Sequence, residues 1–195
     1  MVSPSVTQWA FVALIGAVAL ERLFELRLSA RNAAWAVERG GVEVGQRHFG
    51  VMKALHTAFL LAAPAEVLLL DRAFPGALGL GALITVGATM GLRYWAIATL
   101  GPRWNTRVLV VPGLPAVDAG PYRYLKHPNY LAVILEIAAL PLVHGAWLTA
   151  VVFSVANAAL LRVRIRCEEA ALTAHCAYAD RLAGRPALLP ARRAR

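Results

Sequence analysis

The chain has 195 residues, of which 59% are hydrophobic and 16% are charged, and it carries a formal net charge of +9. Soluble domains are nearer half apolar and a quarter charged, so this composition predicts an integral membrane protein with one compact bundle. Nucleic-acid binding would require a basic soluble face, but the cations here fall in the loops between apolar runs. Cys167 and Cys176 have no second pair beside them, which supports neither a disulfide framework nor a metal site.

Five apolar segments predict an all-α fold with about five transmembrane helices. The first three segments occupy residues 9–28, 49–70 and 76–98. The other two, residues 130–140 and 146–161, face each other across a short turn. The fourth segment is short for a crossing, which takes about 20 apolar residues. Either it borrows neighbouring residues to complete its span, or it forms a hairpin that does not fully cross.

The basic residues predict the orientation of these segments. Of the 20 Lys and Arg residues, 18 lie at or after the ends of the first, third and fifth segments. Because positive charges collect on the cytoplasmic side, five spans with the N-terminus outside and the C-terminus in the cytoplasm explain this distribution. A four-span alternative with a re-entrant fourth segment would place the same loops on opposite sides. Residues 31–47 are predicted as a polar loop and residues 101–120 as a loop rich in Gly and Pro.

Residues 120–130, with the sequence Gly-Pro-Tyr-Arg-Tyr-Leu-Lys-His-Pro-Asn-Tyr, are dense in polar, aromatic and cationic groups. Pro128 suits the first turn of a helix, and it pushes His127 toward an extended conformation. This arrangement places an imidazole and several unpaired backbone N–H groups at a helix start, where the helix dipole favours an anion. Alternatively, the stretch only anchors the protein at the membrane interface, where Tyr, Arg and Lys are common.

A pair of carboxylates, Glu168 and Glu169, is predicted to lie on the same cytoplasmic side. The spans that lead from residues 120–130 and into this pair are joined by a tight turn, so they are expected to be antiparallel neighbours. Arg164 lies one helical turn before Glu168 and could simply pair with it. Adjacent helical positions point about 100° apart, so Glu169 would then be free to face inward. A helix start that faces carboxylates suits a zwitterionic ligand.

Polar residues inside apolar segments are costly in lipid and are therefore functional candidates. At a rise of about 1.5 Å per residue, His56 lies roughly 10 Å and Glu136 roughly 13 Å from the cytoplasmic side. The two could line one pocket as acid or base for a lipid headgroup, or they could form a buried pair that only ties two spans together. Other expectations are that Lys53 snorkels to the interface, that Glu66 pairs with Arg72, that Asn157 makes an interhelical hydrogen bond, and that Trp9, Tyr94, Trp95 and Trp104 are interface anchors.

The C-terminal half resembles the isoprenylcysteine carboxyl methyltransferase family. The resemblance rests on residues 120–130, the apolar hairpin that follows, and Arg164-Ile165-Arg166-Cys167-Glu168-Glu169. Tyr178, Gly184-Arg185-Pro186 and Pro190 continue it, so that it covers roughly the last hundred residues. Upstream, Arg39-Gly40-Gly41-Val42-Glu43 is similar to one bacterial branch, which is associated with the O-methylation of alkylpyrones and alkylresorcinols.

The resemblance implies that S-adenosylmethionine binds on the cytoplasmic side and that a lipid substrate enters from the bilayer. It divides a single membrane-embedded domain, residues 1–195, into three N-terminal spans in residues 1–100 and a cofactor-binding core in residues 101–195. Arg123 or Lys126 would steady an anionic acceptor oxygen. The residues that it implies around the cofactor are His127, Pro128, Tyr130, Glu168 and Glu169, with Tyr124 nearby.

Two departures from the family pattern bear on the substrate. Members that methylate carboxylates usually have Gly two residues after the tyrosine at the position of Tyr130, and this chain has Ala132. Glu136, inside the membrane, is not a general feature of the family. Both departures favour a phenolic or pyrone lipid over a prenylated carboxylate as the methyl acceptor.

Two other functions compete with methyl transfer. Membrane sterol reductases that use NADPH carry a similar His-Pro-Asn-Tyr block but continue it as Phe-Gly-Glu or Gly-Asp, whereas this chain continues with Leu131-Ala132-Val133. A small non-catalytic membrane protein with a basic face would leave the clustering of His127, Tyr130 and the glutamate pair unexplained. The sequence therefore favours an S-adenosylmethionine-dependent O-methyltransferase of the bacterial inner membrane.

Overall fold

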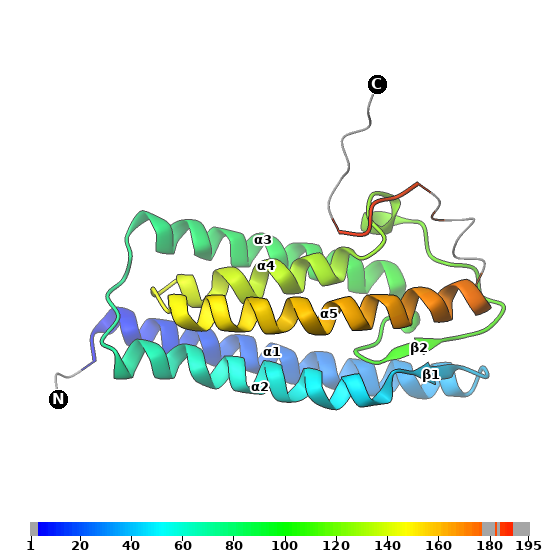
Figure 1. The fold of residues 1–195 in the computed structure, drawn as a ribbon, viewed down its shortest axis with the longest axis horizontal. Coiled ribbons are helices and arrows are strands. Elements are labelled where there is room, and N and C mark those ends of the chain that lie inside the picture. Colours follow the sequence, from blue (N-terminus) through cyan, green and yellow to red (C-terminus); the bar gives the residue numbers. More distant parts are fainter. Residues whose placement is uncertain (1–3, 177–181, 183, 189–195) are drawn as a thin grey trace, which may run out of the picture.

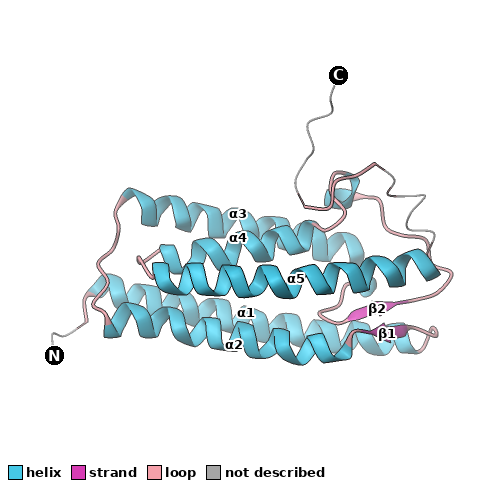
Figure 2. Ribbon diagram, viewed as in Figure 1, coloured by secondary structure: helices cyan, strands magenta, loops and turns pink. Residues whose placement is uncertain are grey.

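The computed structural model describes residues 4–176, 182 and 184–188, and in this part of the chain five long helices form one bundle. The helices lie side by side and alternate in direction, so that their connections fall at the two ends of the bundle (Figure 1). Two short strands lie at the same end as the close of α5 (Figure 2). In chain order the elements are α1 Val6–Val37, β1 Val42–Val44, α2 Gln46–Leu69, α3 Ala77–Leu100, η1 Gly101–Arg103, β2 Val108–Val110, η2 Gly120–Arg123, α4 Pro128–Leu142 and α5 Trp147–His175.

Local sequence explains how the helices begin and turn. A capping box starts α1: Ser5 Oγ accepts from the backbone N–H of Gln8, and the Gln8 side chain accepts from the N–H of Ser5. Between α4 and α5 the chain reverses at Gly145, whose φ of 70° is accessible to glycine at little cost. Large apolar side chains then close the core between the helices, namely Phe11, Ile15, Phe59, Val67, Val86, Ile137 and Leu140.

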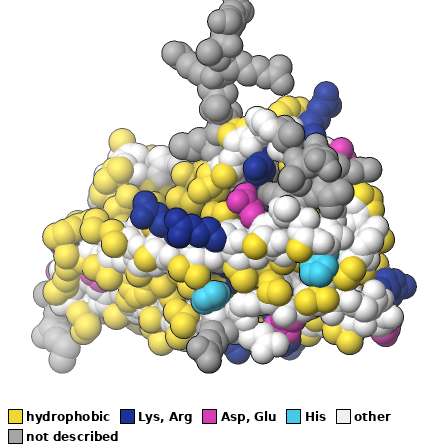
Figure 3. Space-filling view, turned by 45° about the vertical axis from the view of Figure 1, so that its right-hand side comes forward, with side chains coloured by type: hydrophobic (Ala, Val, Ile, Leu, Met, Phe, Trp, Pro, Cys, Tyr) yellow, Lys and Arg dark blue, Asp and Glu magenta, His cyan; other side chains and the backbone are white. Residues whose placement is uncertain are grey.

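The helices confirm the prediction of an all-α membrane protein. By length and apolar composition, three segments can cross a membrane: His48–Leu69, Ala77–Arg103 and Trp147–His175. Hydrophobic side chains dominate the left-hand part of the face in Figure 3, as expected for a lipid-facing flank. Among the most exposed are Leu61, Leu69, Ile84, Val151, Val152 and Val155.

The first and fourth helices differ from the other three. Helix α1 carries Glu21, Arg22, Glu25 and Arg27 in its middle, which lowers its apolar character. Helix α4 has 15 residues. At 1.5 Å per residue it is about 22 Å long, shorter than the roughly 30 Å hydrocarbon core of a bilayer. The fourth segment thus forms the short limb of a helical hairpin with α5, and its helix includes two neighbouring residues at each end of the predicted segment 130–140.

Parts of the two predicted loops form helix or strand instead of loop. The polar loop at residues 31–47 was predicted too long, because α1 continues through its first seven residues. The extension is held by Asn32, whose amide donates to the Trp104 carbonyl at 2.7 Å and to the Gly101 carbonyl at 3.3 Å. Trp104 is only 3% exposed and packs inside this end of the bundle, so its interpretation as an interface anchor is wrong. Trp9 and Trp95 are half-exposed, as an interface position requires.

A two-stranded antiparallel sheet joins the same two loops. Val42 pairs with Val110 and Val44 with Val108, and Arg107 forms an ion pair with Glu43 at 3.2 Å. The apolar side of the sheet packs on the end of α5, where Val44, Val110, Ala171, Leu172 and Cys176 form a small cluster. The sheet thus brings the loop after α1 and the loop after α3 against the part of α5 that carries the glutamate pair.

Candidate functional site

The start of α4 carries the first group of candidate residues. His127 is the N-cap residue, with φ −130° and ψ 60°, and Pro128 is the first residue of the helix. The first N–H groups of any helix have no partner within the helix. No side chain caps them at the start of α4. Gly120 begins the preceding motif with φ 53°, and a Cβ atom there would lie 2.3 Å from Thr99 Oγ1. Glycine is therefore required where η2 approaches the end of α3.

The glutamate pair on α5 meets two aromatic residues at the start of α4. His127 Nε2 lies 3.0 Å from Glu169 Oε1, and the Tyr130 hydroxyl donates a hydrogen bond to Glu168. The His127 and Tyr130 rings stack with their centroids 5.3 Å apart. The fold therefore brings together four of the residues that the sequence singled out, from positions about 40 residues apart in the chain.

Arg164 completes this group, in a way that sequence spacing did not reveal. The spacing suggested an ion pair with Glu168 one turn later, but the buried guanidinium instead donates from Nε to the Tyr130 hydroxyl at 2.9 Å. A second nitrogen of Arg164 donates to the Thr106 carbonyl. The Tyr130 hydroxyl accepts from Arg164 and donates to Glu168, so its single proton is directed to the carboxylate. Arg164 thereby ties α4, α5 and the loop before β2 to one another.

The final described residues close the site from the outside. The backbone N–H of Lys126 donates to the Pro186 carbonyl at 3.0 Å, and that of His127 donates to the Ala187 carbonyl at 3.0 Å. Arg185 donates to the Tyr122 carbonyl at 2.7 Å. These bonds give the Gly184-Arg185-Pro186 part of the motif a physical role, since it holds the approach to α4. Tyr178 and Pro190, which continue the motif, lie outside the described residues.

A cavity of about 520 Å³ runs from this group into the bundle. Of the candidate residues it is lined by His56, Lys126, His127, Tyr130 and Glu168. The wall also contains four residues that were not predicted to line a cavity, namely Trp104, Asn129, Asn157 and Arg164. The side chains of Asn129 and Asn157 each have a buried oxygen without a hydrogen-bond partner, so the interhelical bond expected of Asn157 is not made through that oxygen.

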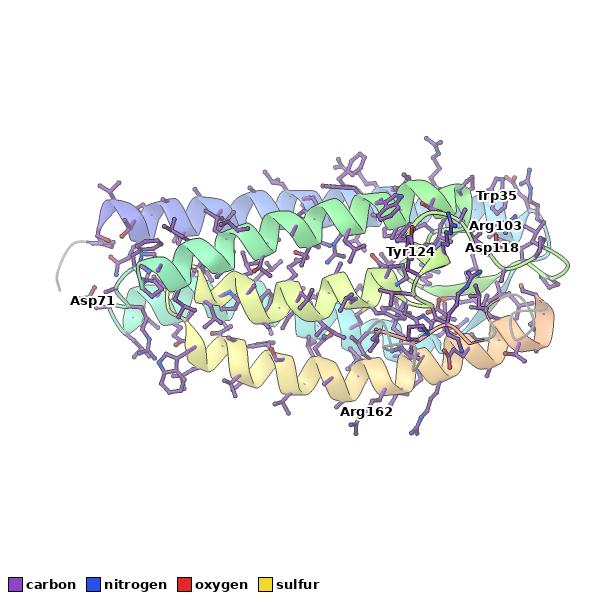
Figure 4. All side chains as sticks on the ribbon, turned by 90° about the horizontal axis from the view of Figure 1, so that it is seen from above. Trp35, Asp71, Arg103, Asp118, Tyr124 and Arg162 are labelled. Carbon is purple, nitrogen blue, oxygen red and sulfur yellow. The ribbon has the colours of Figure 1, made fainter. Side chains whose placement is uncertain are left out.

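The remaining candidates lie outside the cavity wall. Arg123 and Tyr124 are exposed on and beside η2, and the Arg123 guanidinium carbon is 5.9 Å from the centre of the Tyr124 ring. Figure 4 shows Tyr124, Arg103 and Asp118 at the end of the bundle opposite Asp71. Pro128 is buried at the start of α4, and Glu169 reaches the site only through His127.

Neither of the two alternatives for Glu136 and His56 holds, because the two side chains do not pair and only His56 is among the residues that line the cavity. Glu136 accepts a hydrogen bond from Arg93 on α3 and lies 3.4 Å from Arg22 on α1. His56 instead bonds through Nδ1 to the carbonyl of Met52, at 2.9 Å. The physical reason is charge: a buried carboxylate is stabilised more by a guanidinium than by an imidazole that need not be ionised. The sequence placed Arg93 at the end of a span, whereas α3 continues for seven residues beyond it.

Glu25 extends this buried ionic group on α1. It pairs with Arg22 at 2.5 Å and lies 3.7 Å from Arg93. Arg22, Glu25 and Arg93 line the same cavity as His56.

At the other end of the bundle, the expected pair of Glu66 with Arg72 is confirmed at 3.0 Å. Both cysteines are free, and burial raises the pKa of the Cys176 thiol above its usual value.

Comparison with known proteins finds similarity to a family of methyltransferases. The model of the isoprenylcysteine carboxyl methyltransferase (ICMT) family matches residues 82–174. The uncharacterized protein YpbQ of Bacillus subtilis is 41% identical over 162 residues, which cover 83% of this chain and 96% of that protein. An uncharacterized protein of Haemophilus influenzae is 28% identical over 153 residues, covering 78% and 88% of the two chains. The chain belongs to the isoprenylcysteine carboxyl methyltransferase family.

Proposed function

We propose that this protein is an integral-membrane O-methyltransferase that uses S-adenosylmethionine and acts on a lipophilic acceptor. The observation that carries the proposal is the meeting of His127 and Tyr130 with Glu169 and Glu168 beside a cavity of about 520 Å³. Ligand sites in proteins have volumes of roughly 300–1,000 Å³. Membership of a methyltransferase family supplies the class of reaction.

The residues at this end of the cavity fit the methyl donor. S-adenosylmethionine carries a carboxylate, an amino group, a ribose diol and an adenine. The uncapped start of α4 suits the carboxylate, and Glu168 suits the amino group or the diol. Asn129 has a buried oxygen without a partner that could accept a further hydrogen bond. When bound, this group supplies an electrophilic methyl on its sulfonium.

The chain's own residues position and screen the reaction. Glu169 orients His127, and Arg164 orients Tyr130, so that both rings keep their stacked arrangement beside the cavity. Pro128 sets the start of the helix that carries them, and Tyr124 lies outside on the approach. Of the two cations that could steady an anionic acceptor oxygen, Lys126 lines the cavity and Arg123 is exposed, which favours Lys126.

We infer that the acceptor is a lipid that enters from the bilayer, either a phenolic or pyrone polyketide lipid or a prenylated carboxylate. An apolar side to the cavity supports this, since Leu23, Leu60, Leu160 and Leu161 are in its wall. We also propose that the protein lies in a bacterial inner membrane with the N-terminus outside and the C-terminus in the cytoplasm. The basic loops that share one end of the bundle support this orientation.

Ligand-dependent melting of the detergent-purified protein tests the proposal. S-adenosylhomocysteine, the product form of the donor, is expected to raise the melting temperature, because a ligand that binds only the folded state stabilises it. NADPH at the same concentration is expected to leave it unchanged. A rise with NADPH and none with S-adenosylhomocysteine would instead assign the protein to the reductases that share the His-Pro-Asn-Tyr block.

A further inference from the structure

His56, in the wall of the cavity, has its two ring nitrogens in different states. Nδ1 lies 2.9 Å from the carbonyl oxygen of Met52 on the previous turn of α2. A carbonyl can only accept, so Nδ1 carries the proton of the neutral ring and Nε2 carries a lone pair. Among the described residues Nε2 has no hydrogen-bond partner. Nε2 of His56 can therefore accept a proton, and His56 lines the cavity.

Charged side chains from three other helices act on this ring. They are Arg22 on α1, Arg93 on α3 and Glu136 on α4. The two guanidiniums are also paired with Glu21 and Glu25 on α1, so this buried group as a whole carries no net positive charge. Arg22 and Arg93 line the cavity, and each has a buried Nε–H without a partner. On its own helix His56 has Lys53, and α5 contributes Arg164 and Glu168, which are both bonded to Tyr130.

Apolar side chains lie next to these polar groups. Leu23 on α1 and Leu61 on α2 line the same cavity, although they are 54% and 67% exposed on the flank of the bundle. Leu23 is adjacent in the chain to Arg22, and Leu61 lies five residues after His56 on α2. Because α2 is one of the helices that can cross the membrane, this flank faces lipid. The lining of the cavity thus reaches the lipid-facing flank at Leu23 and Leu61, next to its polar wall.

We propose that His56 is the general base of this enzyme, and that its acceptor is a long-chain lipid with a weakly acidic hydroxyl, a phenol or an enol, rather than a carboxylate. The chain of the acceptor would lie along Leu23 and Leu61, with its hydroxyl at His56. This proposal rests on the methyltransferase function proposed above. A carboxylate is already ionised and needs no base, whereas a positioned base accelerates the reaction of a hydroxyl by about 10²–10⁴-fold.

The proton balance of this step is simple. The hydroxyl proton moves to Nε2 as the oxygen forms its bond to the methyl carbon, and the electron pair of the broken carbon–sulfur bond stays on sulfur. His56 is then an imidazolium, with both nitrogens protonated and Nδ1 still donating to the Met52 carbonyl. It returns to the neutral form by releasing the proton to water from the cytoplasmic end of the cavity.

The first test measures acceptor ionisation without the methyl donor. A long-chain nitrophenol, whose absorption reports its ionisation, is titrated with pH on the full-length protein in detergent. The wild type is expected to bind the anion, so the midpoint should lie about one pH unit below that in His56→Phe. His48→Phe, also on α2 but outside the cavity wall, is the matched control and should titrate like the wild type. Equal midpoints in all three proteins would overturn the role of His56.

The second test uses acceptors of graded acidity. With a long-chain alkylphenol, His56→Phe is expected to lower methyl transfer by about 100-fold or more, and with the more acidic nitrophenol by only a few-fold. An equal loss with both acceptors, or transfer by the wild type only to a farnesyl-cysteine carboxylate, would overturn the proposal. S-adenosylhomocysteine should still raise the melting temperature of His56→Phe, which shows that the variant is folded. If it fails to stabilise the wild type, the methyltransferase function itself is wrong.

Discussion

The hydroxyl of Tyr130 is the most constrained single group of the candidate site. It accepts from Arg164 at 2.9 Å and donates to Glu168, and both the tyrosine and the arginine are buried. Removing it would leave a buried guanidinium N–H without its partner, which is more costly than the loss of an average hydrogen bond. The residue therefore supports the geometry of the site as well as lining its cavity.

Tyr130→Phe is expected to lower the free energy of unfolding in detergent by about 1–3 kcal/mol, because a buried charged donor loses its acceptor. The matched control is Tyr94→Phe, whose hydroxyl bonds to Glu21 at 3.0 Å in an exposed position. That loss should change stability by less than about 0.5 kcal/mol, since water replaces the partner. Chemical denaturation of both variants checks this. Equal effects would mean that the Arg164–Tyr130–Glu168 chain contributes no special stability.

The partners of some site residues, but not of others, could be predicted from the sequence. His127, Tyr130 and the glutamate pair were predictable as neighbours, because a tight turn joins the two helices that carry them. The possible pairing of Arg164 with Glu168 is not made, because the spacing of a helical ion pair says nothing about an acceptor held in reach on another helix, here the Tyr130 hydroxyl. The partner of Glu136 was missed for a similar reason: a buried carboxylate pairs with Arg93, and that arginine is found only once α3 is known to continue past it.

At the scale of elements, α5 depends on α2 for the cap of its N-terminus. Its own N-cap residue, Ala146, has no side chain that can accept a hydrogen bond. Glu66 on α2 accepts from the backbone N–H groups of Leu148 at 3.2 Å and Thr149 at 2.7 Å, and from the Thr149 hydroxyl at 2.8 Å. A carboxylate at this position also complements the helix dipole. The ion pair with Arg72 completes its coordination.

Glu66→Ala is therefore expected to lower the free energy of unfolding by about 2–3 kcal/mol, since two helix N–H groups and a guanidinium lose one shared acceptor. Ser5→Ala removes an ordinary cap within α1 and should cost about 1 kcal/mol. Denaturation in detergent compares the two variants. S-adenosylhomocysteine should bind both normally, because these caps are at the end of the bundle opposite the glutamate pair. A Glu66→Ala variant no less stable than Ser5→Ala would contradict the shared cap.

The elements also mark where prediction from sequence ends. The apolar runs revealed the helices because their lengths and composition carry a strong signal. The two strands carry none: each has three residues, too few to show an alternating pattern, and their pairing joins loops that are remote in the chain. Trp104 was misread for the same reason, since its burial depends on Asn32 reaching across from α1.

At the scale of the whole molecule, the alternating direction of the helices places both halves of the site at one end. The loops after α1 and α3 and the end of α5 meet there, and the turns after α2 and α4 lie at the other end (Figure 1). If this end is cytoplasmic, then the site faces the compartment that holds S-adenosylmethionine. The orientation can be tested directly.

Two exposed alanines at opposite ends of the bundle, Ala73 and Ala119, suit a labelling experiment. A membrane-impermeant maleimide applied to intact cells is expected to label Ala73→Cys and to leave Ala119→Cys unlabelled until the membrane is permeabilised. The native Cys167 and Cys176 lie toward the same end as Ala119, so the maleimide should not label them in intact cells. Labelling of Ala119→Cys alone in intact cells would reverse the proposed orientation.

In the proposed function, the start of α4 and the end of α5 together bind the methyl donor, and we call this pair of elements the clamp. Its most direct test is the affinity for S-adenosylhomocysteine, measured by calorimetry on the full-length protein. Wild type and Glu43→Gln, a control whose carboxylate pairs with Arg107 on the sheet, are expected to bind equally. Glu168→Gln should bind at least about tenfold more weakly, since a hydrogen bond to a charged group is worth about 1.5–3 kcal/mol. Equal affinity in all three proteins, or no binding by the wild type, would contradict the clamp.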